Sequence, residues 1–178
     1  MFLEQKIRAG FAHLDADGDG FLTEDDHILM GQRSAAALGY AAGSRSEQFM
    51  IDSYLRVWRI VHQSHAIEGK VSAEEFLAAM LALRANPAVL TDLANALFSI
   101  ADRSGNGRID LGEYLAFLQG QAPNLPEAEG IEAFSHLDRD SDGHLTREEL
   151  ARAVVEYWTS DNLTATGNWL LGHIPVPS

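Results

Sequence analysis

The chain has 178 residues, of which 46% are hydrophobic, and it carries a formal net charge of −13 at pH 7. This charge disfavours binding to nucleic acid or to an anionic membrane surface, because both are themselves negative. The sequence contains no cysteine, which excludes disulfides and thiolate metal sites. The length allows a single core or two closely packed halves.

The first predicted element is a helix whose apolar residues lie mostly three and four positions apart. Those residues are Phe2, Leu3, Ile7, Phe11 and Leu14. The start of the chain therefore runs directly into a helix, without the pattern of a cleavable signal, and the sequence lacks an apolar segment long enough to span a bilayer. We expect a cytoplasmic protein.

An acidic loop, residues 15–26, follows this helix. It has oxygen-bearing side chains at its first, third, fifth, ninth and twelfth positions, and glycine at its sixth. Such spacing is typical of a loop that wraps around Ca²⁺, which needs six to eight oxygens at about 2.3 to 2.6 Å. The expected ligands are Asp15, Asp17, Asp19, the Phe21 carbonyl, Thr23 and Asp26.

The closing residue of this loop, Asp26, stands where glutamate is usual. Its side chain is one carbon shorter, so its carboxylate would lie roughly 1.5 Å farther from the ion unless the loop contracts. We therefore expect a one-oxygen contact and a shell close to the six-ligand octahedron that Mg²⁺ prefers. The first site is predicted to accept both Ca²⁺ and Mg²⁺.

A second loop, residues 64–75, keeps glycine at the sixth position and glutamate at the twelfth but has Ser64 and Ala66 at the first and third. Lys70 occupies the position of the carbonyl ligand. We expect this loop to bind no ion and to serve as a structural partner of the first. Ser72 and Glu75 predict a capping box that opens the next helix.

The helix before this loop is marked by Phe49, Tyr54, Leu55, Val57, Trp58 and Val61. The pattern does not fix the helix boundary between Gly31 and Ser46.

The third and fourth loops, residues 102–113 and 138–149, follow the full pattern, each between two apolar helices. Weaker binding is expected in the third loop because it offers fewer charges. Thr146 can hold a water in the fourth loop. The expected ligands are Asp102, Ser104, Asn106, the Arg108 carbonyl, Asp110 and Glu113 in the third loop, and Asp138, Asp140, Asp142, the His144 carbonyl and Glu149 in the fourth.

Together these elements predict an all-α fold of four helix-loop-helix units in two pairs, packed into one globule. Short β bridges between paired loops are expected at the eighth positions, joining Leu22 to Val71 and Ile109 to Leu145. The break at Asn86 and Pro87 divides the chain into residues 1–85 and 88–178. The second unit carries both complete loops and the C-terminal tail.

The chain resembles the sarcoplasmic calcium-binding proteins and their bacterial relatives, the calerythrin-like proteins. The resemblance covers nearly the whole length and depends on complete first, third and fourth loops beside a degenerate second one. It also depends on the aspartate that closes the first loop, on the short break at Asn86 and Pro87, and on the tail. In the tail, Tyr157, Trp158, Thr159 and Ser160 precede Gly167, Asn168, Trp169 and Gly172. The resemblance implies two halves packed face to face, three Ca²⁺ ions, and a role in calcium buffering and transport, and we expect a monomer.

The main alternative is a calcium sensor that opens an apolar groove and regulates a target protein. Sensors usually present a methionine-rich surface. This chain has Met30, Met50 and Met80 besides the initiator, at positions that core packing explains equally well.

A third possibility is a relative of the photoproteins and luciferin-binding proteins, which share this arrangement of loops and enclose a coelenterazine-type ligand among His, Tyr and Trp side chains. The same residue types occur here at helical spacing, which is more often that of a core. They are Tyr54, Trp58, His62, His65, Tyr157, Trp158, Trp169 and His173.

Catalysis has little support, because the seven histidines form no known motif and no catalytic carboxylate pair stands apart from the loops. His62 and His65 could share a helix face and bind a transition metal, but no third ligand is evident. We expect them to mark a partly exposed helix end, and we expect the protein not to be an enzyme.

Overall fold

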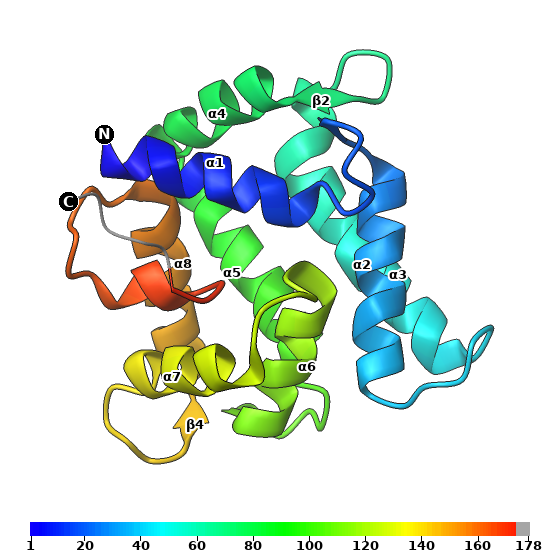
Figure 1. Ribbon diagram of the computed structural model, residues 1–178, viewed down its shortest axis with the longest axis vertical. Coiled ribbons are helices and arrows are strands. Elements are labelled where there is room, and N and C mark those ends of the chain that lie inside the picture. The colour runs from blue at the N-terminus through cyan, green and yellow to red at the C-terminus, as the bar shows by residue number, and fades with distance from the viewer. Residues whose placement is uncertain (174–178) are drawn as a thin grey trace.

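Eight α-helices and four two-residue strands make up most of the fold in the computed structural model, which describes residues 1–173 (Figure 1). Each strand lies in one of the four loops that join the two helices of a unit. The helices are α1 (Phe2–Leu14), α2 (Glu24–Ala37), α3 (Arg45–Val57), α4 (Ala73–Ala82), α5 (Pro87–Ala101), α6 (Leu111–Gln121), α7 (Glu127–Leu137) and α8 (Arg147–Thr159). The strands are β1 (Phe21–Leu22), β2 (Val71–Ser72), β3 (Ile109–Asp110) and β4 (His144–Leu145).

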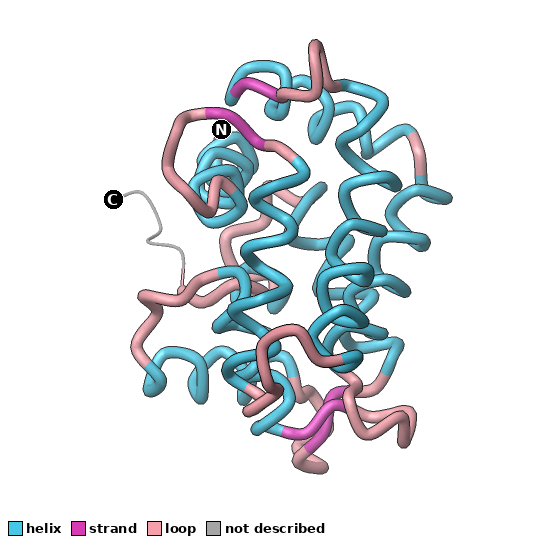
Figure 2. Tube along the Cα trace, turned by 90° about the vertical axis from the view of Figure 1, so that its right-hand side faces the viewer, coloured by secondary structure: helices cyan, strands magenta, loops and turns pink. Residues whose placement is uncertain are grey.

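The strands pair two by two, as the sequence predicts. Leu22 lies opposite Val71 in the antiparallel pair β1–β2, and Ile109 lies opposite Leu145 in the pair β3–β4. All four of these side chains are fully buried. Figure 2 shows the two pairs at opposite ends of the molecule. The pairing therefore couples loop 1 to loop 2, and loop 3 to loop 4.

The helix that leaves each loop begins with a capping box made from the loop itself. The ninth loop residue is the N-cap, and the twelfth is the third helical residue, whose carboxylate accepts a hydrogen bond from the backbone N–H of the N-cap. The four pairs are Thr23 with Asp26, Ser72 with Glu75, Asp110 with Glu113, and Thr146 with Glu149. The twelfth residue thus has a structural role in every loop, whether or not the loop binds an ion.

A single hydrophobic core extends across both halves of the chain. Helix α5 crosses the middle of the molecule, where it packs against α3 from the first half and α8 from the second (Figure 1). Helix α2 packs against both α3 and α6. The ring of Phe76 meets that of Trp158 edge to face, with centroids 6.0 Å apart, so the two halves share aromatic contacts.

The segment before loop 2 differs from the expected regular helix. Helix α3 ends at Val57 and continues as a π-helix, Trp58–His62, and then as a 3₁₀ turn, Gln63–His65. The expectation of a partly exposed helix end is wrong for His62, which is 3% exposed and contacts the rings of Trp58 and Phe76. The wider π turn changes the face that the side chains present, and periodicity does not predict such a turn.

Phe49 also differs from its expected place on a packed helix face. It is 51% exposed. Its ring is covered by the guanidinium of Arg103 in loop 3, 4.8 Å from the ring centroid, which is a cation–π contact between the two halves. Helix α2 ends at Ala37, and Ser44 caps α3. These bounds fix the boundary that the alanine- and glycine-rich pattern left open.

The C-terminal segment is held against α1 by a buried lysine. The Lys6 ammonium donates to Asn168 Oδ1 at 2.8 Å and to the Glu156 carbonyl at 3.0 Å. Burial lowers the pKa of Lys6 to about 8. Gly167 lies so close to α8 that an added Cβ would clash with Glu156 and with the Ala153 carbonyl. Residues 160–173, which follow α8, are therefore part of the packed structure.

No single helix within residues 1–173 is long and apolar enough to cross a membrane. The α4–α5 region, 73–85 with 87–101, meets the length and composition test only as a pair bent by 108°. Both helices contribute many side chains to the core.

Candidate metal centres

Loop 1 gathers three of its predicted ligands into one acidic group. One carboxylate oxygen each from Asp15, Asp17 and Asp26 lie within 4.8 Å of one another. Gly20, at the sixth position, has φ +89°, a backbone conformation that favours glycine, and its N–H donates to Asp15 at 3.0 Å. Hard cations such as Ca²⁺ prefer such sets of oxygen ligands. The Phe21 carbonyl and Thr23 belong to the same loop, at its seventh and ninth positions.

The shorter closing residue of loop 1 reaches the same backbone groups as the glutamate of loop 4. Asp26 Oδ1 accepts a hydrogen bond from Ala16 N at 2.8 Å, and its Oδ2 accepts one from Thr23 N at 2.7 Å. In loop 4, Glu149 Oε1 accepts from Arg139 N at 2.9 Å and Oε2 from Thr146 N at 2.8 Å. Asp26 therefore holds the loop backbone through the same pair of hydrogen bonds as Glu149, although its side chain is one carbon shorter. The one-oxygen contact to an ion stays a prediction.

Loop 4 forms a second acidic group, from Asp138, Asp140 and Glu149, whose carboxylate oxygens also lie within 4.8 Å of one another. Burial alone would raise the pKa of Glu149, but the hydrogen bonds from Thr146 and from the backbone N–H groups of Arg139 and Asp140 outweigh it and lower the pKa. The closing carboxylate is therefore ionised at neutral pH, as a cation ligand must be.

The fifth residue of loop 4, Asp142, connects the two loops of its pair. Its Oδ2 lies 3.4 Å from the guanidinium of Arg108 in loop 3. Its Oδ1 accepts a hydrogen bond from the N–H of His144, the residue whose carbonyl is the predicted ligand at the seventh position. Sequence spacing assigns Arg108 only a backbone carbonyl. The position of its side chain depends on the β3–β4 pairing, which brings loop 3 beside loop 4.

Loop 3 contains an unpaired carboxylate oxygen, a feature that favours a cation site. Asp102 Oδ1 is buried and has no hydrogen-bond partner among the described residues. A buried carboxylate oxygen without a partner is costly, and a bound cation would satisfy it. Glu113 is 8% exposed, and its two oxygens accept hydrogen bonds from the backbone N–H groups of Ser104 and Asp110. Asn106, the predicted ligand at the fifth position, orders the turn by accepting a hydrogen bond from Arg108 N at 2.8 Å.

Loop 2 forms a tight turn at its fourth to seventh positions, where the other loops have predicted ligands at the fifth and seventh. Ile67 and Lys70 exchange two backbone hydrogen bonds, of 2.8 and 3.0 Å, around Glu68 and Gly69, which both have positive φ. This is the geometry of a two-residue hairpin turn. The Lys70 carbonyl, at the seventh position, is therefore already paired. The Lys70 ammonium lies 5.0 Å from the ring centroid of Phe21 in loop 1, which adds a contact between the paired loops.

Comparisons with known proteins agree with this geometry. Residues 90–155 match the family described as an EF-hand domain pair. Calerythrin of Saccharopolyspora erythraea is 25% identical over 160 residues, covering 85% of this chain and 89% of that protein. The chain is thus similar to the calcium-binding EF-hand proteins of the calerythrin type, and its second half matches an EF-hand domain pair.

Two further similarities come from luciferin-binding proteins. The luciferin-binding protein of Renilla reniformis is 26% identical to this chain over 175 residues, covering 96% of this chain and 93% of its own. The crystal structure of the coelenterazine-binding protein from Renilla muelleri, in its calcium-loaded apo form, superposes with a TM-score of 0.82 at 24% identity, covering 97% and 96% of the two chains. The structural likeness supports the same fold.

The chain can bind hard cations, which is the chemistry that these acidic loops support. Its loops supply carboxylates and carbonyls whose hydrogen bonds to the loop backbone hold them in place before an ion arrives. Sequence reasoning did not assign Arg33 of α2, whose guanidinium donates to the Ala16 carbonyl of loop 1 at 2.9 Å. Arg33 lies 17 residues from Ala16, and no local motif marks such a contact.

Proposed function

We propose that this protein is an intracellular calcium buffer with three ion sites, in loops 1, 3 and 4, and that the first site also accepts Mg²⁺. The proposed ligands are those that the loop spacing predicts. In this proposal, residues 1–85 and 88–178 act as two EF-hand pairs, of which the first holds one ion and the second holds two.

The main support for a buffer is the burial of the apolar surface that a sensor would offer to a target. Met30, Met50 and Met80 are each no more than 1% exposed. The contact of Phe76 with Trp158 joins the two halves, and the core is continuous across them. Side chains that are buried in this way are not available to a target helix, which supports a buffer over a sensor.

Calcium is expected to act as part of the folded structure. Loops 1 and 4 each crowd carboxylates that repel one another when no cation is bound. An ion held at a hundredfold excess over its dissociation constant stabilises the native state by about 2.7 kcal/mol, so three such sites would contribute about 8 kcal/mol. That sum is comparable to the whole stability of an ordinary domain.

The test is a calorimetric calcium titration of metal-free protein, with and without millimolar Mg²⁺, with apolar-dye fluorescence read on the same samples. A buffer should bind three ions tightly, lose calcium affinity at one site when Mg²⁺ is present, and bind less dye when calcium is added. A rise in dye binding on calcium addition would instead indicate the alternative, a sensor that exposes an apolar groove and regulates a target protein.

A second candidate function is the carriage of an aromatic small molecule, as the name of the Renilla relative indicates for that protein. In its favour, an internal cavity is lined by His62, Gln121 and Trp158 among aliphatic side chains. Its volume of about 30 Å³ is far below the roughly 300 to 1,000 Å³ of typical ligand pockets. The core would have to open for such a ligand, and so the buffer is favoured. Quenching of tryptophan fluorescence by coelenterazine would favour the carrier.

A further inference from the structure

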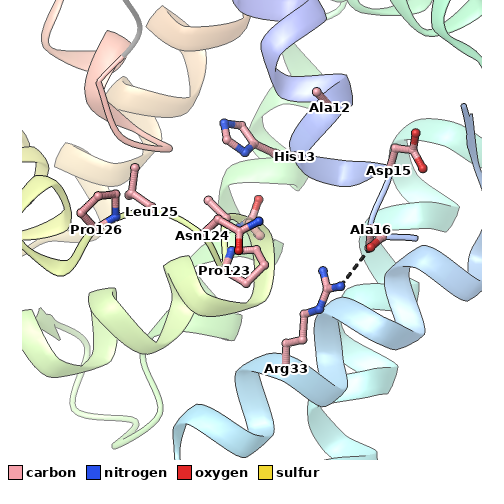
Figure 3. A pocket seen from close by; sticks show the side chains of 11 residues that line it. Ala12, His13, Asp15, Ala16, Arg33, Pro123, Asn124, Leu125 and Pro126 are labelled. Carbon is pink, nitrogen blue, oxygen red and sulfur yellow. Dashed lines mark hydrogen bonds between the residues drawn. The ribbon is translucent and has the colours of Figure 1, made fainter. Parts of the chain in front are cut away.

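A pocket of about 330 Å³ lies where the two halves of the chain meet (Figure 3). Its walls come from the end of α1 and the start of loop 1, from Arg33 of α2, and from residues 121–126, which close α6 and lead into α7. Neither half forms this pocket alone. It is separate from the calcium ligands, except that Asp15 of loop 1 lies on its wall.

Arg33 is a half-buried cation at this pocket. Its guanidinium donates to the Ala16 carbonyl at 2.9 Å, and among residues 1–173 it has no carboxylate within ion-pair distance. The ion pairs of other arginines, such as Arg8 with Glu74, lie elsewhere on the surface. A guanidinium has five N–H donors, and the Ala16 carbonyl occupies only one nitrogen. The remaining donors can serve a ligand.

Gln121 supplies a second unsatisfied donor. Its side chain is 4% exposed, and its amide nitrogen has no hydrogen-bond partner among the described residues. An unpaired buried amide is costly, so a polar ligand atom at this position would be stabilising. Gln121 lines both this pocket and the small internal cavity beside Trp158, so it forms the boundary between the two.

The rest of the wall combines polar side chains with a short apolar surface. His13 and Asn124 project into the same region as Arg33 in Figure 3. The apolar part consists of Ala12, Ala122, Pro123, Leu125 and Pro126. The pocket therefore offers one full positive charge, amide donors, and room for a few carbon atoms.

We propose that this pocket binds a small organic monocarboxylate. A guanidinium matches a carboxylate in shape and charge, because two parallel N–H donors face two oxygens. Arg33 balances the single negative charge of a carboxylate. A phosphate dianion would carry a second negative charge, which Arg33 would leave unbalanced next to Asp15. The apolar wall then packs against a short aliphatic or aromatic group. The volume lies at the lower end of the range for small-molecule sites.

This binding is coupled to calcium at loop 1. The Asp15 carboxylate opposes an anion in the pocket, and a calcium ion held by that carboxylate offsets its charge. Arg33 also holds the Ala16 carbonyl, within the loop that closes around the ion. Calcium should therefore raise the affinity for the carboxylate, and by linkage the carboxylate should raise the affinity for calcium at loop 1 by the same factor.

The test uses the full-length protein saturated with calcium, titrated calorimetrically with butyrate and benzoate. The uncharged probes 1-butanol and benzyl alcohol, and inorganic phosphate, are measured in parallel. We expect saturable one-to-one binding of at least one carboxylate, and weaker or no binding of the alcohols and of phosphate. Absence of saturable carboxylate binding at millimolar concentration overturns the proposal, as does equal binding of the alcohols or of phosphate.

Two variants locate the site. Arg33→Gln should weaken carboxylate binding about tenfold or more, since it removes the charged donor. Ala12→Phe should block the pocket by bulk and leave Arg33 in place, because Ala12 is exposed and tolerates a larger side chain. Arg45→Gln, which removes an exposed arginine at the start of α3, is the matched control and should change nothing. Unchanged binding in both pocket variants, at an unchanged calcium stoichiometry, places the ligand elsewhere and refutes this site.

The coupling has its own test. Affinity for the carboxylate should be roughly fivefold or more higher with calcium than without it, within the range of ordinary coupling energies. Metal-free Asp15→Asn protein should bind the carboxylate more tightly than metal-free wild type, because the opposing charge is gone. Equal affinities in these comparisons would remove the coupling. The three-ion calcium stoichiometry is measured separately, so failure of this proposal leaves the buffer function unaffected.

Discussion

Loops 1 and 2 are bonded to each other through β1 and β2, yet only loop 1 gathers an acidic group. Both loops have glycine at the sixth position with positive φ, and both open the next helix with a capping box. They differ in the first five residues and in the turn, where loop 2 pairs Ile67 with Lys70 across a tight hairpin.

The difference between loops 1 and 2 shows that this loop motif has two separate roles, one structural and one in ion binding. The frame of the loop is the β pair, the glycine turn and the capping carboxylate, and it forms in both loops. The ion site needs, in addition, oxygen-bearing side chains at the first, third and fifth positions and a free carbonyl at the seventh. A loop can therefore lose its ion and keep its structural function, because the two sets of residues overlap only at the ninth and twelfth positions.

The largest expected effect comes from removing the closing carboxylate of a complete loop. Glu149→Gln should remove one ion from the calcium stoichiometry, since the amide offers one oxygen and no charge. Stability in calcium should fall by about 2.7 kcal/mol if that site was held at a hundredfold excess over its dissociation constant. Calorimetric titration gives the ion count, and thermal unfolding in calcium gives the stability.

The matched control for this change is Glu75→Gln in loop 2. It should alter the capping box of α4 and leave the ion count at that of the wild type. A lower ion count in Glu75→Gln would contradict the separation of frame and site, because it would mean that loop 2 binds an ion.

A second comparison tests the glycine turn that both loops share. Gly20 and Gly69 have φ of +89° and +80°, and an added Cβ would meet no other atom within 4 Å at either position. Alanine at either position should therefore cost only backbone strain, about 1 to 2 kcal/mol. Chemical denaturation of metal-free protein should give similar losses for Gly20→Ala and Gly69→Ala.

Calcium should then distinguish the two variants. Gly20→Ala should weaken binding at loop 1, because the Gly20 N–H holds the Asp15 carboxylate in place and the turn leads directly into Phe21, whose carbonyl is a predicted ligand. Gly69→Ala should leave all calcium affinities unchanged. If both variants lower calcium affinity equally, the strain is transmitted through β1–β2, and the two loops are not independent.

The length of the closing residue in loop 1 gives a smaller effect, on selectivity. Asp26→Glu should restore a two-oxygen contact and reduce competition by Mg²⁺ at that site, because Mg²⁺ prefers six ligands at shorter distances. The reciprocal change, Glu149→Asp, should make loop 4 more sensitive to Mg²⁺. Calcium titrations at several Mg²⁺ concentrations measure both. If Mg²⁺ competes with neither the wild-type first site nor Glu149→Asp, the proposed mixed site is wrong.

Much of the fold followed from the sequence because loop spacing fixes a register. Once the twelve positions are aligned, the pairing of Leu22 with Val71 and of Ile109 with Leu145 follows, and so does the capping box at Ser72 and Glu75. These are local relations, or relations between equivalent positions of repeated units. Three of the predicted ligands in each of loops 1 and 4 likewise lie close together, because they come from single loops.

Several features that the sequence did not predict depend on an irregular turn or on contacts between distant segments. His62 is buried because a π-helix turns it toward Trp58 and Phe76. Arg33 meets loop 1, and Gln121 is buried unpaired, because two halves of the chain pack together. Apolar spacing describes the face of one helix and says nothing about which polar side chain of another helix will meet it.

The smallest expected effect concerns the pH dependence of the capping box in loop 2. Hydrogen bonds from the backbone N–H and the hydroxyl of Ser72 lower the pKa of Glu75 from its ordinary value of 4.5. Since the folded-state pKa is the lower one, this carboxylate contributes stability above pH 4.5, and the contribution is lost as the pH falls through the folded-state value. Metal-free protein should therefore lose stability below pH 4.5, and Glu75→Gln should lose less.

Urea denaturation of both proteins between pH 3 and pH 6 measures this difference without interference from calcium binding. Equal pH slopes would show that the capping carboxylate of the ion-free loop does not support the fold. The frame shared by loops 1 and 2 would then depend on the β pair and the glycine turn alone.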